Sequence, residues 1–340
     1  MLDLDRLRAL TTIAEYGSVS AAADALGITA SAVSQQIAKL ERETSSCLLE
    51  RNGRGVRLTD AAWLLVGHAE RILRLVTEAE ADLEAQRGSV VGQIGIAAPA
   101  TVSRGLLPRV VRDLATHHPR LTVRLHETVP KTSLPRMLRG EYDLTIVHDW
   151  RNSPLPLPEG LERVHLLDDP AEIALPASHP LAGRPSLAFA ELATEKWIAA
   201  PSGDICHDWL VGMLREAGVE PEIAHYSTEY PTQLELVAAG LGVAVLPRLG
   251  RGRLPDGLVT VPVRPTLVRR LYAVWRSEAG RRPAVQAVVA ALRAAVGTVE
   301  GARPVPAGPP PPHSEGVKHT ERETVPHDVH DHRRPPAAAW

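Results

Sequence analysis

The stretch Gly17-Ser-Val-Ser-Ala-Ala-Ala-Asp-Ala-Leu-Gly-Ile-Thr-Ala-Ser-Ala-Val-Ser-Gln-Gln-Ile-Ala-Lys-Leu-Glu41 predicts two short helices joined by a tight turn. Ser20 is placed to cap the first helix, and Gly27 can take the left-handed conformation that ends it. Thr29 is placed to cap the second helix. This helix-turn-helix arrangement is typical of proteins that read duplex DNA.

The second of these helices has one apolar face and one polar face. Val33, Ile37 and Leu40 recur at helical spacing and are predicted to face the core. The polar side chains left on the outer face are Ser31, Ser34, Gln35 and Lys39. Because small hydroxyl and amide groups suit base edges and phosphates, this face is predicted to contact DNA.

The residues after this helix predict a hairpin that carries arginines. Asn52-Gly53-Arg54-Gly55 is typical of the turn between two short strands, 48–51 and 56–58. Residues 30–58 hold five basic and three acidic side chains, whereas the whole chain has a net charge of −2. Three arginines at intervals of three suit phosphate contact or insertion into a minor groove: Arg51, Arg54 and Arg57. The alternative for each of them is an ordinary solvated surface charge.

The pattern as a whole resembles the N-terminal domain of LysR-type transcriptional regulators. The resemblance rests on Leu7, Ala14, Gly17-Ser18, Ala22-Ala23, Leu26, Ser34, Ile37, Leu40-Glu41, Leu48, Arg51, Arg54, Val56 and Leu58-Thr59. The chain departs from the family at Thr44, Ser45, Leu49 and Ala62, where an apolar residue, a glycine, a phenylalanine and a glycine are usual.

The resemblance implies which side chains contact DNA. Base reading is implied for Ala30, Ser31, Ser34 and Gln35, with Thr29 and Lys39 beside them, and phosphate or groove contact for Arg51, Arg54 and Arg57. Ala30 stands where many members carry a longer polar residue, so fewer direct contacts with bases are expected at this position.

Residues 61–87 predict a long helix that pairs with a copy of itself. The segment has no proline, and apolar residues recur at alternating intervals of four and three: Leu65, Ala69, Ile72, Val76, Ala79 and Leu83. Such a heptad seam flanked by charges is typical of a coiled coil. The alternative is an amphipathic helix packed on its own domain. Pairing is favoured because a dimer doubles the DNA contacts and sets the half-site spacing.

The 340 residues suffice for a small DNA-binding unit and a larger sensor. Cys47 and Cys206 fall in different predicted domains, which argues against a disulfide framework. The first residues lack the pattern of a secretion signal, and no later stretch is long and apolar enough to span a bilayer. We therefore expect a cytoplasmic protein without a membrane partner.

From residue 93 onward short apolar runs alternate with helical segments, which predicts a parallel sheet covered by helices on both faces. The expected strands are 93–97, 122–127, 142–147, 164–167, 171–175, 196–199, 222–226, 242–246 and 270–275. The expected helices are 106–117, 134–139, 205–217, 231–239 and 283–296.

Four motifs of this region are similar to landmarks of the LysR-type effector-binding domain. They are Gly105-Leu-Leu-Pro108, Arg139-Gly-Glu-Tyr-Asp-Leu144, Ser178-His-Pro-Leu181 and Val237-Ala-Ala-Gly-Leu-Gly-Val-Ala-Val-Leu-Pro247. The resemblance implies two α/β lobes joined by two crossing strands, as in a periplasmic binding protein. The expected fold class is α/β, with an all-α winged helix-turn-helix domain and a long linker helix before a two-lobed (type 2) effector domain.

The expected domains follow from these patterns. They are 1–60 for DNA binding, 61–88 for the linker and dimerisation helix, 89–298 for effector binding, and 299–340 for a disordered tail rich in proline and histidine. Within the effector domain, lobe 1 is expected at about 92–163 plus 267–298 and lobe 2 at about 164–266.

Polar residues stand before helices in both predicted lobes. In open sheets a ligand sits where strands end, and helix N-termini there offer free N–H groups and partial positive charge, which suits anions. The residues expected to line the effector cleft are Thr101, Ser103, Ser202, Thr228 and Tyr230. The alternative for each is an ordinary helix cap. Asp204 at the rim leaves the charge of the ligand open, since a carboxylate repels anions and attracts amino groups.

The sequence carries no nucleophile elbow, phosphate-binding loop, His-Glu-x-x-His or dinucleotide fingerprint, so no enzyme activity, cofactor or metal is expected. His148-Asp149 and His117-His118 lack a third partner and are expected in loops or at helix ends. Cys206, near a helix start, has two alternatives: a thiol sensor of lowered pKa, or the favoured buried bystander. His327-Asp-Val-His-Asp-His332 in the tail would hold a metal only loosely.

These expectations combine into a regulator that binds promoter DNA through paired winged helix-turn-helix domains and responds to a small-molecule effector. The resemblance implies a dimer of dimers that bends its DNA, and it leaves contact with RNA polymerase open. Two alternatives remain. One is an effector-independent regulator whose α/β module serves only oligomerisation, and the other is a solute-binding protein, which the missing export signal disfavours.

Overall fold

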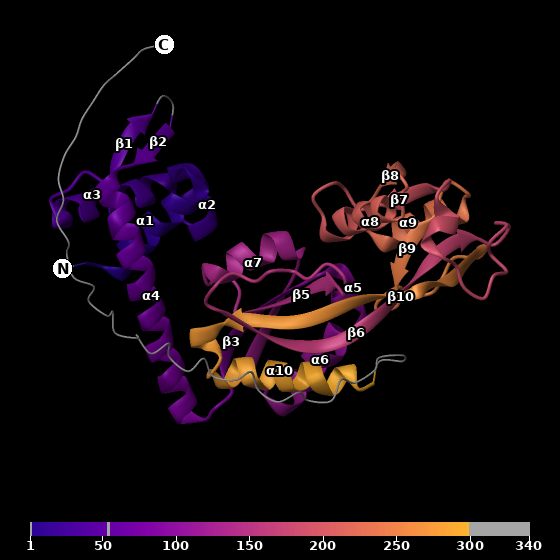
Figure 1. Ribbon diagram of the computed structural model, residues 1–340. Coiled ribbons are helices and arrows are strands. Elements are labelled where there is room, and N and C mark those ends of the chain that lie inside the picture. Colours follow the sequence, from indigo (N-terminus) through magenta and orange to yellow (C-terminus); the bar gives the residue numbers. More distant parts are fainter. Residues whose placement is uncertain (1, 53–54, 299–340) are drawn as a thin grey trace, which may run out of the picture. The chain divides into compact units, whose positions relative to one another are not determined.

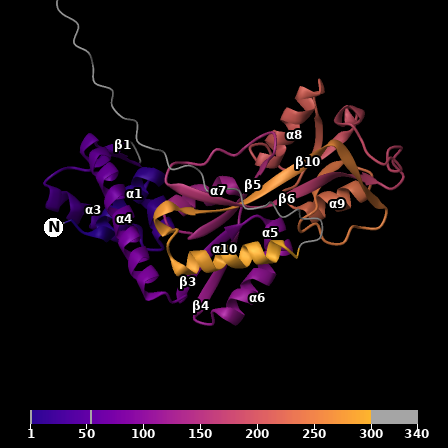
Figure 2. The ribbon, with the colours of Figure 1, turned by 60° about the horizontal axis from the view of Figure 1, so that its bottom comes forward.

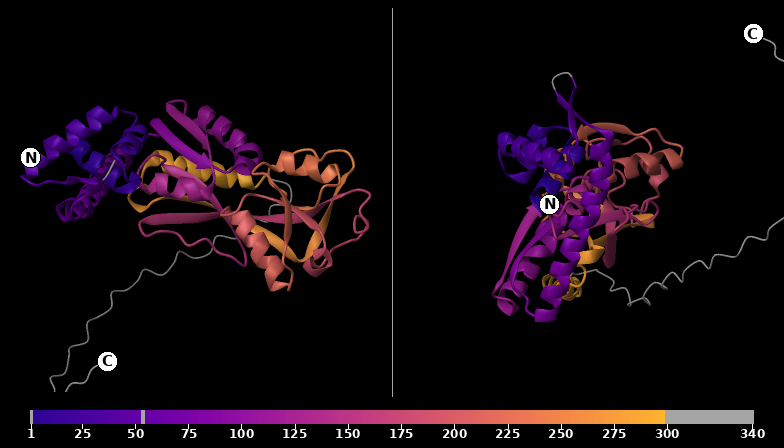
Figure 3. Two further views of the ribbon diagram at one scale, coloured as in Figure 1. Left: turned by 90° about the horizontal axis from the view of Figure 1, so that it is seen from above. Right: turned by 90° about the vertical axis from the view of Figure 1, so that its left-hand side faces the viewer.

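The computed structural model describes residues 2–52 and 55–298 and begins with three helices followed by a two-stranded hairpin (Figure 1). These elements are α1 (Leu4–Tyr16), α2 (Val19–Leu26), α3 (Ala30–Thr44), β1 (Leu49–Asn52) and β2 (Gly55–Leu58). The antiparallel hairpin extends from the helical bundle, as Figure 3 shows, and we call it the wing. The predicted helix-turn-helix with its hairpin is therefore confirmed.

The ends of α2 and α3 are fixed by local hydrogen bonds. Ser18, and not Ser20 as the sequence suggested, caps α2, because the extended backbone of Ser18 lets its hydroxyl accept the N–H of Ala21 at 3.1 Å. Gly27 ends α2 with φ at 67°, in the left-handed region that glycine enters freely. Thr29 caps α3 as expected.

The linker helix α4 (Asp60–Arg87) packs its first half on the bundle. Ala69 is fully buried in the core of the bundle, and Leu65 and Ile72 pack against the same core. The predicted pairing seam is therefore wrong for Ala69, because the core of its own protomer already covers that residue. The large apolar side chains that α4 leaves exposed are Trp63, Leu64, Leu75 and Leu83.

The rest of the described chain is built on one mixed sheet of six strands in the order β4-β3-β5-β10-β6-β9, with β7 and β8 paired separately. The strands are β3 (Gly92–Ala98), β4 (Leu121–Glu127), β5 (Leu144–Trp150), β6 (Leu161–Pro176), β7 (Lys196–Ala199), β8 (Glu222–Tyr226), β9 (Ala244–Pro247) and β10 (Leu258–Arg276). The sequence predicted a parallel sheet, and only part of the sheet is parallel. β3 runs parallel to β4 and β5, whereas β10 returns through the sheet antiparallel to β5 and β6.

Two long strands join the lobes of this module (Figure 1). The sequence suggested separate strands at 164–167 and 171–175, but β6 is one strand of 16 residues. It continues through Asp168 and Asp169 because these carboxylates stand opposite Arg270 and Arg269 of β10 in the ladder. Asp169 forms an ion pair with Arg269 of the neighbouring strand, whereas Asp168 pairs with Arg151 and His165, so neither carboxylate breaks the strand.

Helices cover the sheet in each lobe. They are α5 (Ala100–Gly105), α6 (Leu107–His117), α7 (Pro130–Leu138), α8 (Ile205–Glu216), α9 (Tyr230–Ala238) and α10 (Pro283–Val296), with short 3-10 turns η1 (Phe189–Leu192) and η2 (Ser277–Ala279). α6 and α10 lie side by side (Figure 2), and their apolar residues share a core with Ile94 and Ile96 of β3. A second core in the other lobe surrounds Trp197 and Leu214.

None of the helices within residues 2–52 and 55–298 combines the length and the apolar composition that a membrane span requires. The predicted disordered tail, with its histidines, lies outside the described residues.

The turn after α3 generates a stability prediction. Ser45 adopts φ of 48°, a left-handed conformation that costs a residue with a Cβ about 1 kcal/mol relative to glycine. We expect Ser45→Gly to raise the free energy of unfolding by about 1 kcal/mol in guanidinium titrations of the full chain. The neighbouring Ser46→Gly serves as control and should not stabilise. Equal behaviour of the two variants would contradict this account of the turn.

Candidate nucleic-acid interface and ligand pocket

The outer face of α3 is solvent-exposed, as the sequence predicts. Val33, Ile37 and Leu40 are buried in the bundle, and this fixes the rotation of the helix. The exposed residues of the opposite face and of the preceding turn are Thr29, Ala30, Ser31, Ser34, Gln35 and Lys39. The structure therefore brings these six predicted residues onto one surface. Their contact with DNA stays a prediction.

The polar groups of this surface differ in what they can offer a base. The Ser34 hydroxyl donates to the Ala30 carbonyl at 2.9 Å, so its hydrogen is used within the helix and its lone pairs remain. The exposed Gln35 amide carries both a donor and an acceptor, the pair that can bind adenine in a bidentate manner. Gln35 is therefore the side chain of α3 best suited to read a base.

The wing carries two described arginines, and their surroundings differ. Arg57 donates to the Glu50 carboxylate across the hairpin, with Nη2 and Nε at 2.5 and 3.0 Å from Oε1. Arg51 is exposed and lies on the same strand as Glu50. Arg54, the third arginine that the sequence singled out, lies outside the described residues. Arg51 is therefore the described wing cation to test for phosphate contact.

A pocket of about 220 Å³ lies among three loops of the α/β module. Its lining is Val129, Pro130, Lys131, Pro201, Ser202, Gly203, Asp204, Ile205 and Thr228. These residues lie at or just before the first turns of α7, α8 and α9. Of the residues that the sequence assigned to effector binding, Ser202 and Thr228 line this pocket. Lys131, which the sequence analysis missed, faces them from the other lobe.

Lys131 brings the two sides of the pocket together. A Cβ added at Gly203 would lie only 3.1 Å from the Lys131 Nζ, so the ammonium group lies close to the opposite loop. Asp204 also lines the pocket, but its carboxylate caps α8 by accepting the N–H of Cys206 at 2.8 Å. The ammonium group is therefore the charged group most available to a ligand.

The other predicted effector residues lie deeper. Thr101 and Ser103 belong to the short helix α5, where the sequence suggested a loop, and Thr101 is only 3% exposed. Their hydroxyl oxygens are buried without a hydrogen-bond partner among the described residues. Neither residue lines the 220 Å³ pocket, so their role in ligand binding stays a prediction.

Tyr230, the fifth predicted residue, belongs to a cluster around a thiol in which His148 is buried and Cys206 and Tyr230 are partly buried. Cys206 Sγ lies 3.5 Å from His148 Nε2 and 3.9 Å from the Tyr230 hydroxyl. His148 and Asp149 are in the buried strand β5, so the prediction that they lie in a loop or at a helix end is wrong. Cys206 and His148 are 58 positions apart in the sequence, and no local pattern signals their contact.

Burial keeps this cluster neutral. It lowers the pKa of His148 from 6.5 to about 3, with a further contribution from the charge of Arg269. Burial also raises the pKa of Cys206 from 9.0 to about 11, and the Asp204 carboxylate adds to this shift. The lowered pKa that a thiol sensor requires is therefore not observed at the partly buried Cys206, and its role as a bystander stays a prediction.

An ion pair lies beneath the cluster, on the two strands that join the lobes. Arg269 of β10 donates to Asp169 of β6 from Nη2 at 2.7 Å and from Nε at 3.1 Å, and both side chains are buried. Burial by itself would lower the pKa of Arg269, but the Asp169 carboxylate raises it above its usual value. The other carboxylate oxygen accepts the N–H of Leu249 at 2.9 Å, so the pair also holds the segment after β9.

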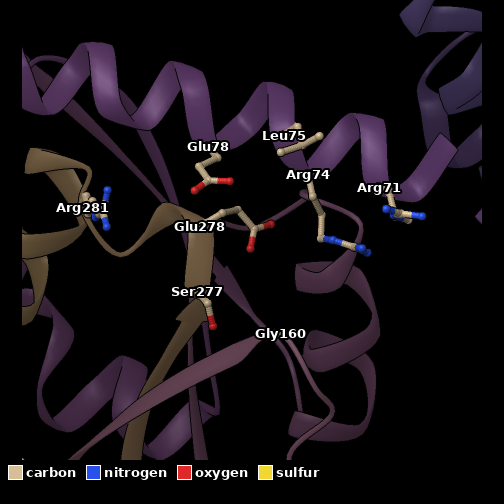
Figure 4. A pocket seen from close by; sticks show the side chains of 8 residues that line it. All are labelled: Arg71, Arg74, Leu75, Glu78, Gly160, Ser277, Glu278 and Arg281. Carbon is tan, nitrogen blue, oxygen red and sulfur yellow. The ribbon is translucent and has the colours of Figure 1, made fainter. Parts of the chain in front are cut away.

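A second pocket, of about 500 Å³, lies beside the linker helix (Figure 4). It is lined by Arg71, Arg74, Leu75, Glu78, Gly160, Ser277, Glu278 and Arg281. Charged groups of both signs surround it, and none of the predicted site residues is among them. Within the described part of the chain, no group of three or more His, Cys, Asp or Glu side chains is arranged to hold a metal ion.

Two family models match the chain over almost all of its described length. The model described as bacterial regulatory helix-turn-helix protein, lysR family, matches residues 4–63. The model described as LysR substrate binding domain matches residues 87–297. The residues between the two matches, 64–86, all belong to the linker helix α4.

Similar proteins span nearly the same length. The hydrogen peroxide-inducible genes activator of Escherichia coli O6:H1 is 31% identical over 296 residues, which cover 86% of this chain and 95% of that protein. The small neutral protease regulatory protein of Streptomyces lividans is 33% identical over 301 residues, or 86% and 81% of the two chains. A full-length OxyR variant from Pseudomonas aeruginosa has the same fold, with a TM-score of 0.64 at 23% identity, covering 86% of this chain and 98% of that one.

Base reading and phosphate contact can be separated by two substitutions. We expect Gln35→Ala to reduce discrimination against a mismatched base pair by about 1–3 kcal/mol and to leave the salt dependence of binding unchanged. Arg51→Ala should weaken binding to all duplexes and make the slope of log K against log salt shallower by about 0.9. Gel-shift series over salt, with matched and mismatched duplexes, measure both effects. The same response from the two variants would refute the division of roles.

The buried imidazole generates a pH prediction. Because the folded pKa of His148 is about 3, the unfolded chain binds a proton more readily below pH 6.5. His148 therefore contributes stability that is complete above that pH and is lost as the pH falls toward 3. In denaturant titrations, the parent should lose up to about 1.4 kcal/mol per pH unit more than His148→Gln on acidification. His117→Gln, which removes an exposed imidazole, should behave like the parent.

Proposed function

Because the chain belongs to the LysR family of transcriptional regulators, we propose that a small organic anion held beside Lys131, Ser202 and Thr228 controls its binding to promoter DNA. The protein is a DNA-binding regulator with an effector-binding domain. The observation that carries the proposal is the 220 Å³ pocket, whose walls come from loops before three helices.

The electrostatics of the pocket favour an anion. Helix N-termini carry partial positive charge and free N–H groups, and α7, α8 and α9 all begin there. Lys131 adds a full positive charge within reach of both lobes. A carboxylate between the lobes would therefore gain attraction from three helix ends and one ammonium group.

The size and lining of the pocket limit the rest of the ligand. Ligand pockets usually have volumes of about 300–1,000 Å³, so a pocket of 220 Å³ admits a short-chain or single-ring molecule. Val129, Pro130, Pro201 and Ile205 provide an apolar wall. The lining fits a carboxylic acid with a small apolar body, and such a ligand alters DNA binding only if it prefers one arrangement of the assembly.

The protein works on DNA as an oligomer, and we place the pairing surface on α4. The exposed Leu64, Leu75 and Leu83 would be covered there by a second copy. Arg71 and Arg74 precede Glu78 and Glu80 along the helix, so an antiparallel pair would bring opposite charges together. Assembly into a dimer of dimers and contact with RNA polymerase remain predictions of the family resemblance.

A ligand screen on the full chain tests the proposed effector site. We expect small carboxylates to raise the thermal midpoint and to shift the affinity for promoter DNA, whereas the matched amides do neither. Lys131→Gln should abolish both responses and leave DNA binding without ligand unchanged. Lys196→Gln, which removes an exposed lysine that does not line the pocket, is the control. If no compound of a broad library shifts the thermal midpoint of the parent protein, the alternative is favoured, in which the α/β module serves only oligomerisation.

A second candidate signal is an oxidant, because Cys206 lies beside His148 and one relative is named as a hydrogen peroxide-inducible activator. Peroxide would convert the thiol to a sulfenic acid and release water. The raised pKa of Cys206 ranks this candidate second, since the thiolate is the reactive form. If an oxidant is the signal, peroxide should add one oxygen atom to Cys206 of the parent protein and change its affinity for DNA. Cys206→Ser should show neither effect. Mass spectrometry and gel shifts on the treated protein provide the readouts.

A further inference from the structure

The turn between the recognition helix and the wing is held by one carboxylate. A single oxygen of Glu41, Oε1, accepts the backbone N–H of Leu48 at 2.8 Å and that of Leu49 at 3.2 Å. The backbone carbonyl of Glu41 also accepts the N–H of Ser46 at 3.1 Å. Through these bonds Glu41, on α3, fixes the point at which β1 begins.

The other end of the wing is held at the same place. The N–H of Thr59 donates to the Leu48 carbonyl at 3.0 Å, and its hydroxyl donates to the Cys47 carbonyl at 2.8 Å. The same hydroxyl accepts the N–H of Ala62 and so caps α4. The peptide groups at Leu48 thus connect three elements: the recognition helix through Glu41, the wing through the strand itself, and the linker helix through Thr59.

Apart from these hydrogen bonds, two effects disfavour a negative charge at the position of Glu41. It lies in the last turn of α3, where the helix dipole disfavours a negative charge. It also belongs to the helix-turn-helix domain, where a carboxylate disfavours the approach of phosphates. The two N–H groups that it satisfies compensate for both effects.

The wing needs such an anchor because it is small. Two strands of four residues cannot hold their own orientation in water. Leu48 is buried in the bundle core, which fixes the depth of the wing but not its direction. Hydrogen bonds at its base, from Glu41 on one side and Thr59 on the other, supply the direction.

We propose that Glu41 and Thr59 are positioning residues that set the wing and the linker helix at fixed angles to α3. Glu41 would place the wing arginines on the phosphates beside the groove that α3 enters. Thr59 would relate α3 to α4, and so set the separation of the two recognition helices in a dimer. Neither residue would itself carry the sequence preference.

The Glu41 bond can be separated from the Glu41 charge. Glu41→Gln removes the charge and keeps an oxygen acceptor, whereas Glu41→Ala removes both. We expect Glu41→Gln to keep the salt slope of the parent, and Glu41→Ala to become shallower by about one to two units as wing contacts are lost. Preference for matched over mismatched sites should survive in both. Glu43→Ala, two residues further along α3 and paired with Arg6, is the control and should keep the parental slope.

Two substitutions of Thr59 test whether this residue sets the preferred distance between the two half-sites on DNA. Thr59→Ser keeps the hydroxyl and Thr59→Val removes it at nearly the same volume. On operators with one base pair inserted between half-sites, the parent and Thr59→Ser should lose affinity, and Thr59→Val should lose less because its helices are less firmly related.

The proposal is overturned if folded, dimeric Glu41→Ala shows the same salt slope as Glu41→Gln, or if Thr59→Val keeps the spacing preference of the parent. Circular dichroism and size-exclusion chromatography establish folding and dimerisation for each variant. If Glu41→Ala does not fold, Glu41→Asp takes its place, because it retains the charge but is too short to reach both N–H groups. An unchanged slope in that variant would refute the role of Glu41 equally.

Discussion

The buried pair of Asp169 and Arg269 between β6 and β10 is the interaction on which the effector module depends. Both strands run through the two lobes, and their ladder is the connection that makes one sheet of six strands. Removing one member would leave an uncompensated charge in the interior, which typically costs about 3–5 kcal/mol. The pair also holds the segment after β9 through Leu249, so the same carboxylate joins that segment to the two long strands.

Two different environments lie close together in this module, since Ile205 lines the pocket and the next residue, Cys206, contacts His148. The 220 Å³ pocket contains Lys131 and lies at three helix N-termini, so it suits a negatively charged ligand. The inner cluster keeps Cys206 protonated and His148 neutral, because burial disfavours charge on either group. A charged ligand would be held beside Lys131, whereas an oxidant must reach the neutral surroundings of the thiol. The electrostatics therefore favour the pocket at Lys131 as the place where a signal is received.

On the DNA side, buried and hydrogen-bonded residues hold the exposed polar face of α3 in place. Val33, Ile37 and Leu40 fix the rotation of α3, so that Gln35 faces outward. The left-handed Ser45 and the Glu41 carboxylate then direct the chain into the wing. The residues that form this surface are in contact within about thirty positions of the chain, and this is why a local sequence pattern could predict it.

The sequence by itself determined the parts whose physics is local. The inward and outward faces of α3, the cap at Thr29 and the stop at Gly27 follow from helical spacing and from backbone preferences, and each is as expected. Only the tertiary structure decided the rest. It made β6 continuous by placing cations opposite its aspartates, it buried Ala69 in its own domain, and it brought His148 to Cys206. Those outcomes depend on which distant segments become neighbours, and neither periodicity nor composition carries that information.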